Sequence, residues 1–262
     1  MGFSSWLGKR QPSARSRCGS PTKRPRHRPR LEALEDRWLP STFTVLNNLD
    51  SGGGSLRGEI AIAASGDTIV FDNSLAGQTI KLTSGELAIT KSLTIDGLGA
   101  DTLTISGNNA GRVFDISGST TTVLIEDLTV ANGFVNSTTV NGPLGAAALG
   151  GGILDNQATL ALANVTLSNC QATNFVGGGG GVASVSGATL SVDSCTFTDN
   201  TAAGTSVNSP GGAILSDANS TLTVQNSTFS GNHAIDGGAI GVWGGSQSSI
   251  TTSTFDLSLI HI

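Results

Sequence analysis

Apolar and polar residues alternate in short segments that recur along the second half of the chain with a nearly constant internal spacing. Each copy opens on glycines that precede an apolar anchor, and the anchors are 29, 32 and 26 residues apart at Ile153, Val182, Ile214 and Ile240. Two further apolar positions are always five residues apart: Leu162 and Leu167, Val192 and Phe197, Val224 and Phe229, and Ile250 and Phe255. The spacing within the strand pair is therefore constant, while the loops vary in length.

A repeat made of short alternating strands predicts a solenoid, because one copy cannot bury its apolar face alone and must share a core with its neighbours. In one copy, Leu222 and Val224 point inward while Thr223 points outward. Asn226 then bends the chain, since Asn tolerates left-handed backbone angles. With Gly-Gly-x-Ile as a third strand and no helical periodicity, the sequence predicts an all-β parallel β-helix. A leucine-rich horseshoe would need a helical segment in every copy.

The repeats also resemble a known family. Gly211-Gly212-Ala213-Ile214 followed by Thr228-Phe229-Ser230-Gly231-Asn232 is similar to the repeats of bacterial polymorphic outer-membrane proteins, and the resemblance extends over residues 79 to 255. It implies a right-handed parallel β-helix, the pectin-lyase-like architecture. We expect the repeats to occupy residues 73–256, with the ladder of Leu167, Phe197, Phe229 and Phe255 in the core.

Residues 42–72 are predicted to cap the N-terminal end of the solenoid. Thr42–Val45 is an alternating strand, and residues 55 to 64 form a short amphipathic helix with Ser55 as its N-cap. An uncovered solenoid end exposes core and strand edges, so the helix serves as a lid. The segment resembles the cap that precedes β-helical repeats in many bacterial extracellular proteins. Arg57 is expected to pair with Glu59 or Asp67.

Two long segments between strands are expected to loop out from the wall and to offer binding surfaces. Residues 131–149 form the longest insertion, with Pro143 and several Gly and Ala residues. Residues 201–210 form the second. Exposed Thr, Ser and Asn ladders between the loops are further candidate contact surfaces.

The charge is distributed unevenly between the first 40 residues and the remainder. Residues 1 to 40 contain ten Lys or Arg and three acidic residues, whereas the remainder contains four and sixteen, which makes the net charge −5 overall. The leader is rich in Arg, Pro and Ser without apolar periodicity, so residues 1–41 are expected to be disordered. A nucleic-acid partner is not expected, because no aromatic residues interleave with these charges and the body is acidic.

The leader ends on a second resemblance. Leu31, Glu32, Leu34, Glu35, Arg37 and Leu39 match the motif L-E-x-L-E-x-R-x-L, which is found near the start of large secreted or surface proteins of planctomycete-type bacteria. Ala33 and Pro40 depart from the usual pattern. The resemblance implies a sorting-type motif and a bacterial extracellular or cell-surface location. There is no run of 18 apolar residues, so no transmembrane helix is expected.

Three cysteines do not make a disulfide framework. Cys18 lies in the leader, and Cys195 is expected in the core, in the inward slot that Val165 and Ser227 occupy in neighbouring copies. Cys170 aligns with Asn200 on the far side of a strand. A Cys170–Cys195 bridge is therefore not expected.

Catalytic chemistry is the rival hypothesis, since pectate lyases, polygalacturonases and related carbohydrate enzymes share this architecture. A lyase needs a strong base and a positively charged group near the sugar carboxylate, yet the only basic residues of the body are Arg57, Lys81, Lys91 and Arg112. A glycosidase needs two suitably spaced carboxyl groups, and those available are Asp155, Asp193, Asp199, Asp217, Asp236 and Asp256.

No catalytic residue is assigned from these candidates. His233 beside Asp236 is the nearest approach to an acid–base pair, and Asp199, Asp217 and Asp236 are expected to accept backbone hydrogen bonds in turns. No cofactor is expected. A structural calcium ion is conceivable in such a solenoid, but no metal ligands are assigned.

The sequence therefore predicts a non-catalytic, structural or adhesion-type protein that binds a polysaccharide or another cell-surface component. A carbohydrate-active enzyme, a polysaccharide lyase or glycoside hydrolase, is the alternative. Residues 257–262 have no counterpart in the other copies and resemble the translation of a sequencing adapter. We expect them to add a poorly fixed strand or to fray, and the chain to be a monomeric domain of a longer protein.

Overall fold

The chain forms a right-handed parallel β-helix of about seven turns. Its strands alternate inward and outward side chains, and bends at fixed positions separate them. The computed structural model describes residues 39–136, 141–142, 145–146, 148–174, 177–204, 210–258 and 260–261. They belong to one unit that begins at Leu39. The leader, its motif up to Trp38, and Cys18 lie outside the described residues. The predicted fold class is confirmed.

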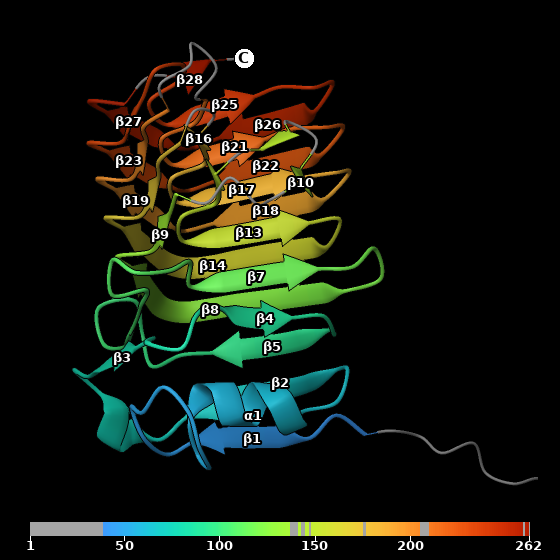
Figure 1. Ribbon diagram of the computed structural model, residues 1–262, viewed down its shortest axis with the longest axis vertical. Coiled ribbons are helices and arrows are strands. Elements are labelled where there is room, and N and C mark those ends of the chain that lie inside the picture. Colours follow the sequence, from blue (N-terminus) through green and yellow to red (C-terminus); the bar gives the residue numbers. More distant parts are fainter. Residues whose placement is uncertain are drawn as a thin grey trace, which may run out of the picture. The chain divides into compact units, whose positions relative to one another are not determined.

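The solenoid wall consists of stacked parallel sheets that run through successive coils (Figure 1). The first strand file contains β1 (Thr42–Val45), β2 (Asp67–Phe71), β5 (Leu93–Asp96), β8 (Thr122–Ala131), β14 (Thr159–Ser168), β18 (Thr189–Asp193), β22 (Thr221–Gln225) and β26 (Gln247–Thr251). The second contains β3 (Thr79–Lys81), β6 (Thr104–Ser106), the C-terminal halves of β8 and β14, β19 (Thr196–Thr198), β23 (Thr228–Ser230) and β27 (Thr254–Asp256). The third contains β4 (Leu87–Ile89), β7 (Phe114–Ser117), β13 (Ile153–Asn156), β17 (Val182–Val185), β21 (Ile214–Ser216), β25 (Ile240–Val242) and β28 (Ile260–His261).

A fourth strand in four of the coils was not predicted. Two-residue strands form a further parallel sheet, which contains β9 (Phe134–Val135), β15 (Gln171–Ala172), β20 (Thr201–Ala202) and β24 (His233–Ala234). Segments of two residues are too short for an alternation pattern to reveal them, so the three strands expected per coil are one too few in these coils. Smaller pairs join β10 (Asn141–Gly142) with β11 (Gly145–Ala146), and β12 (Ala148–Leu149) with β16 (Gly177–Gly178).

From β8 onward, the bend between the first two strand files has a left-handed backbone in each coil. Its φ angles are 51° at Asn164, 55° at Ser194 and 51° at Asn226, and Asp127 and Thr252 adopt the same conformation. Asn and Asp tolerate this region better than other side chains. The predicted role of Asn226 is confirmed. In β8 and β14 the strand assignment continues through the bend.

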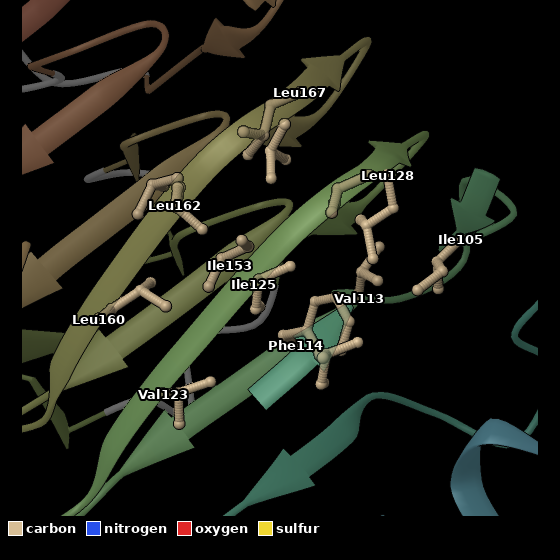
Figure 2. Packing of buried hydrophobic residues seen from close by; sticks show 14 of the residues in the cluster. Ile105, Val113, Phe114, Val123, Ile125, Leu128, Ile153, Leu160, Leu162 and Leu167 are labelled. Carbon is tan, nitrogen blue, oxygen red and sulfur yellow. The ribbon is translucent and has the colours of Figure 1, made fainter. Parts of the chain in front are cut away.

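Inward side chains form one apolar core from Val45 to Ile240. Figure 2 shows part of it, where Phe114, Ile125 and Ile153 pack together from different strands. The predicted ladder is confirmed, because Leu167 pairs with Phe197, and the rings of Phe197, Phe229 and Phe255 stack with centroids 4.8 Å apart. Phe255 is only partly buried, since it lies in the last coil.

An asparagine ladder links the coils from inside. The buried Asn200 accepts a hydrogen bond from the Cys170 backbone N–H at 3.0 Å and donates to the Leu167 carbonyl at 2.9 Å. Asn232 repeats the arrangement one coil later, where it accepts from the Asn200 N–H and donates to the Phe197 carbonyl. These side chains satisfy backbone groups that the corner between strands leaves unpaired.

We expect Asn200→Ala to lower the free energy of unfolding by about 2 to 3 kcal/mol, because it leaves a buried N–H and a buried carbonyl without partners. Chemical denaturation measures the loss. Asn226→Gly is the control, since glycine keeps the left-handed bend and the Asn226 side chain is exposed. Equal effects of the two changes would contradict the role given to the ladder.

The predicted cap helix is confirmed as α1 (Leu56–Ile62). The Ser55 side chain accepts a hydrogen bond from the Gly58 N–H at 3.1 Å, as an N-cap residue should. Leu56 and Ile60 are buried in the same cluster as Val45. A short 3-10 helix, η1 (Asn73–Leu75), follows β2.

The long insertions are held more closely to the wall than expected. At one end of the first, Phe134–Val135 pairs with β15, and at the other Ala148–Leu149 pairs with β16. Leu149 packs with Leu154, Ala183, Val185 and Leu215 in a second apolar cluster on the face of the third file that points away from the core. The expectation that all of 131–149 loops out is therefore wrong at both ends. In 201–210, residues 201–202 are strand β20, and 205–209 lie outside the described residues.

The tail follows the coil further than its sequence suggests. Leu257 has a φ of 49°, in the left-handed region that Asp199 and Gly231 also adopt. The Ser258 hydroxyl accepts a hydrogen bond from the Asn232 N–H at 3.0 Å, the position that asparagine fills in earlier coils. Residues 260–261 add β28 beside β25.

Cys195 is buried in its predicted slot, in register with Val165 and Ser227. Cys170 is also fully buried in the core, so its expected position on the far side of a strand is wrong. Both thiols are free. Burial raises the pKa of Cys170 to about 12 and that of Cys195 to about 11, so neither is a reactive thiolate at neutral pH.

Candidate functional site

A file of threonines runs along the outside of the second strand file and forms what we call the hydroxyl face. Its seven members are in register on successive strands: Thr79, Thr104, Thr129, Thr166, Thr196, Thr228 and Thr254. None is buried. Adjacent parallel strands lie about 4.8 Å apart, so the methyl and hydroxyl groups repeat at that interval.

A second row of hydroxyl groups accompanies the upper part of this face, two residues further along each strand. It contains Ser168, Thr198 and Ser230. The Thr129 hydroxyl donates to the Ala100 carbonyl. Those of Thr166, Thr196 and Thr228 form no hydrogen bond with the part of the protein that the structure describes. They are therefore available to a ligand.

Two cavities, which both include Glu86, lie on the early coils and form what we call the Glu86 groove. The larger has a volume of about 480 Å³, and Ser84, Glu86, Arg112, Phe134 and Asn136 are among its lining residues. The second has a volume of about 350 Å³ and is lined by Arg57, Ile60, Glu86 and Lys91 among others. Glu86, which immediately precedes β4, lines both cavities.

Arg112 is the buried cation of the groove, and its side chain is only 5% exposed. The guanidinium donates through Nε to the Gly150 carbonyl at 3.0 Å and through Nη2 to the Leu149 carbonyl at 3.1 Å. Its Nη1 donates to Glu86 Oε2 at 2.6 Å. Arg112 thus ties the end of the long insertion to Glu86, one coil below.

Glu86 and Asp115 form a pair of carboxyl groups around this guanidinium, since Asp115 Oδ2 lies 3.8 Å from Arg112 Nη1. Burial raises the pKa of Asp115, Arg112 opposes the shift, and the charge of Glu86 and a hydrogen bond with it add to the increase. Both carboxyl groups therefore lie beside the same buried guanidinium.

Neither Glu86 nor Asp115 was predicted from the sequence. The available signal was the register of the third strand file, in which Leu87 pairs with Phe114 and so places Glu86 beside the segment that contains Arg112. That register could not be predicted from the sequence, because the loops between the early strands are irregular in length. The carboxylates considered instead were in the later, more regular copies.

Arg57 has a different partner from those expected. It forms an ion pair with Asp50 at 2.9 Å and donates to the carbonyls of Gly85 and Glu86. Burial would raise the pKa of Asp50, but hydrogen bonds from Ser84, Arg57 and Thr83 hold it well below the usual range. Asp67 accepts instead from the backbone N–H groups of Ser41 and Ala64, which lower its pKa. Arg57 is therefore structural, and only its partner was predicted wrongly.

The structure does not gather the sequence candidates into a site. The His233 side chain is exposed, and its backbone N–H donates to the Asn200 carbonyl at 2.8 Å. Asp236 accepts through its main chain, from the Gly211 N–H. Asp217 accepts from the next backbone N–H, that of Ala218, at 2.7 Å, as a turn carboxylate should.

The remaining carboxylates are spread over different coils. Asp193 accepts from the Asn226 side chain at 3.0 Å, and hydrogen bonds from Asn226 and Gln225 lower its pKa. Asp155 is fully buried in the core. Asp199 and Asp256 lie at the ends of β19 and β27. Within the described ranges, no three His, Cys, Asp or Glu side chains come together as a metal site would require.

The fold places the chain in the class of parallel β-helix proteins. No protein-family model matches it, and searches of curated proteins and of solved structures find no match. Among the described residues, no helix is long and apolar enough to cross a membrane.

Proposed function

We propose that this chain is a structural or adhesion-type β-helix of a bacterial surface or extracellular protein, which binds a polysaccharide or another surface component without catalysing a reaction. The observation that carries the proposal is the hydroxyl face, a regular and uncharged array over seven strands. The resemblance to polymorphic outer-membrane protein repeats and the leader motif support the extracellular location.

An uncharged hydroxyl array suits a hydroxylated polymer because both partners exchange hydrogen bonds without the desolvation cost of a charge. Many weak contacts then act together along the solenoid, and multivalency raises the overall affinity. The strands hold the hydroxyl groups in fixed positions, so the protein loses little conformational entropy when a ligand binds.

We expect the purified protein to bind polysaccharides on a glycan array and the triple variant Thr166→Ala, Thr196→Ala, Thr228→Ala to bind at least tenfold more weakly. The matched control replaces Thr159, Thr189 and Thr221, which form an exposed file at the start of the neighbouring strands. Unchanged binding by the first variant would contradict the proposal.

A carbohydrate-active enzyme is the second candidate, and the Glu86 and Asp115 pair beside Arg112 is the observation that favours it. A depolymerisation assay on the same purified sample separates the two. Turnover of any polysaccharide by the wild-type protein, abolished by Glu86→Gln, would establish the enzyme and overturn the non-catalytic proposal. Binding without turnover supports the proposal.

A further inference from the structure

The larger cavity of the Glu86 groove is bounded by three separate parts of the chain. They are the segment before β4, which contains Ser84 and Glu86, the segment before β7, which contains Arg112, and residues 134 to 136 in and after β9. Its volume of about 480 Å³ is within the usual range for small-molecule sites. The cavity is distinct from the hydroxyl face, because none of the threonines of that face lines it.

Phe134 presents an aromatic ring at this cavity. Its backbone N–H donates to the Gly111 carbonyl at 2.9 Å, and β9 pairs with β15, so its position is held from two sides. Val135, on the opposite face of the same strand, is buried with Ala148 and Ala172. Phe134 is half-buried and is the aromatic residue that lines this cavity.

Polar groups at the same cavity can bind hydroxyl groups. The Glu86 side chain is 37% exposed although one oxygen accepts from Arg112, so it can accept further hydrogen bonds. Asn136 is exposed, and its amide side chain forms no hydrogen bond with the described part of the chain. A buried guanidinium holds the acceptor in place, which limits the entropy lost when a ligand binds.

The charge balance selects against anionic sugars. Arg112 brings one positive charge, and Glu86 and Asp115 bring two carboxyl groups, so the cluster has no positive charge to spare. Arg57 and Lys91 line the second cavity, where Arg57 is paired with Asp50 and Lys91 donates to the Ala63 carbonyl. In the larger cavity, a uronate would therefore meet Glu86 and a guanidinium that is already paired with it.

We propose that the cavity between Glu86 and Phe134 binds a neutral sugar unit of a polysaccharide, with Phe134 stacking on the ring and Glu86 and Asn136 bound to its hydroxyl groups. The inference rests on the proposed saccharide-binding function, and it adds a second site with its own specificity. The hydroxyl face gives affinity for an extended polymer, whereas this cavity selects one uncharged unit of it.

The test is calorimetric titration of the whole chain with cellohexaose, laminarihexaose and mannohexaose as neutral probes, and with hexagalacturonate as the anionic probe. We expect at least one neutral probe to bind, and Phe134→Ala and Phe134→Leu to weaken it about tenfold or more, because leucine keeps apolar volume without a ring. Glu86→Gln should weaken binding several-fold. Ile235→Ala, at an exposed apolar residue elsewhere, is the matched control.

The outcomes separate this inference from the proposed function. If glycan-array binding is lost in the hydroxyl-face variant but neutral probes bind Phe134→Ala and Phe134→Leu as tightly as wild type, the cavity inference fails and the proposed function stands. Tighter binding of hexagalacturonate than of every neutral probe would also overturn the inference. If the wild-type protein binds no saccharide on either assay, both fail. Thermal melts of each variant confirm that it is folded.

Discussion

Phe197→Ala is expected to lower the free energy of unfolding by about 3 to 5 kcal/mol. Phe197 is fully buried, and its ring lies between Leu167 in one neighbouring coil and Phe229 in the other. Truncation leaves a cavity between three coils and removes a stacking contact, while the strands on either side hold the space open. Because the surrounding solenoid can collapse very little into this cavity, the loss of unfolding free energy should be as large as that for other large buried side chains.

Denaturant titration and thermal melts both measure this loss. For a chain of this size, 1 kcal/mol corresponds to a shift of about 2 to 4 °C in Tm. Thr196→Ala, one residue earlier on the outer side of the strand, is the control. Phe255→Ala should cost less, because Phe255 is only partly buried. A melt of Phe197→Ala that moves by less than a degree would contradict the register of the ladder.

The second large effect concerns Asp155, whose side chain points into the apolar core. It is fully buried in β13, in register with Ser184 and Ser216 on the next two coils. The Ser184 hydroxyl donates to Asp155 Oδ2 at 3.1 Å, whereas Oδ1 has no hydrogen-bond partner among the residues that the structure describes. Burial therefore raises the pKa of Asp155 to about 7, against weaker opposing effects of hydrogen bonds from Ser184 and Ala158.

A raised pKa makes the folded state hold a proton that the unfolded chain releases. Below the unfolded pKa near 4, both states are protonated and the titration of Asp155 costs no stability. As pH rises from about 4 to 7, the unfolded state loses its proton first, so stability falls by up to about 4 kcal/mol and then levels off. The buried acid is thus best tolerated below about pH 4.

Asp155→Asn should remove this dependence. We expect the variant to gain stability relative to wild type by up to about 4 kcal/mol between pH 4 and pH 8. The free energy of unfolding is measured as a function of pH for both proteins, and the difference between the two plots isolates the contribution of Asp155 from those of the other carboxyl groups. Asp193→Asn, which removes a partly exposed carboxylate with a lowered pKa, should not reproduce the gain. If the free energies of unfolding of wild type and Asp155→Asn change with pH in the same way, Asp155 does not have the raised pKa in the folded state.

Much of the fold could be predicted because its signals are local. The five-residue step from Val192 to Phe197 combines two inward positions with a bend, and left-handed angles at Ser194 and Asn226 confirm that bend. The cap helix could also be predicted, since Ser55 and the apolar residues after it lie within one short segment.

The candidate sites were harder to predict because they depend on contacts between coils. Arg57 meets Asp50 and the segment before β4, although Glu59 and Asp67 are closer in sequence. Cys170 lies in the core, and its backbone N–H donates to the Asn200 side chain of the next coil. The insertion at 131–149 contributes strands because its ends meet β15 and β16, which no local pattern encodes.

The sequence alone determined the parallel β-helix, its bends and its core file of Leu167, Phe197 and Phe229, because alternation and backbone preference act over a few residues and repeat in every copy. Only the tertiary structure decided which outward groups meet, such as Arg112 with Glu86, and which buried oxygen lacks a hydrogen-bond partner among the described residues, as Asp155 Oδ1 does. The physical reason is that loops of unequal length separate the strands, so groups far apart in sequence are brought together by stacking of the coils and not by any local pattern.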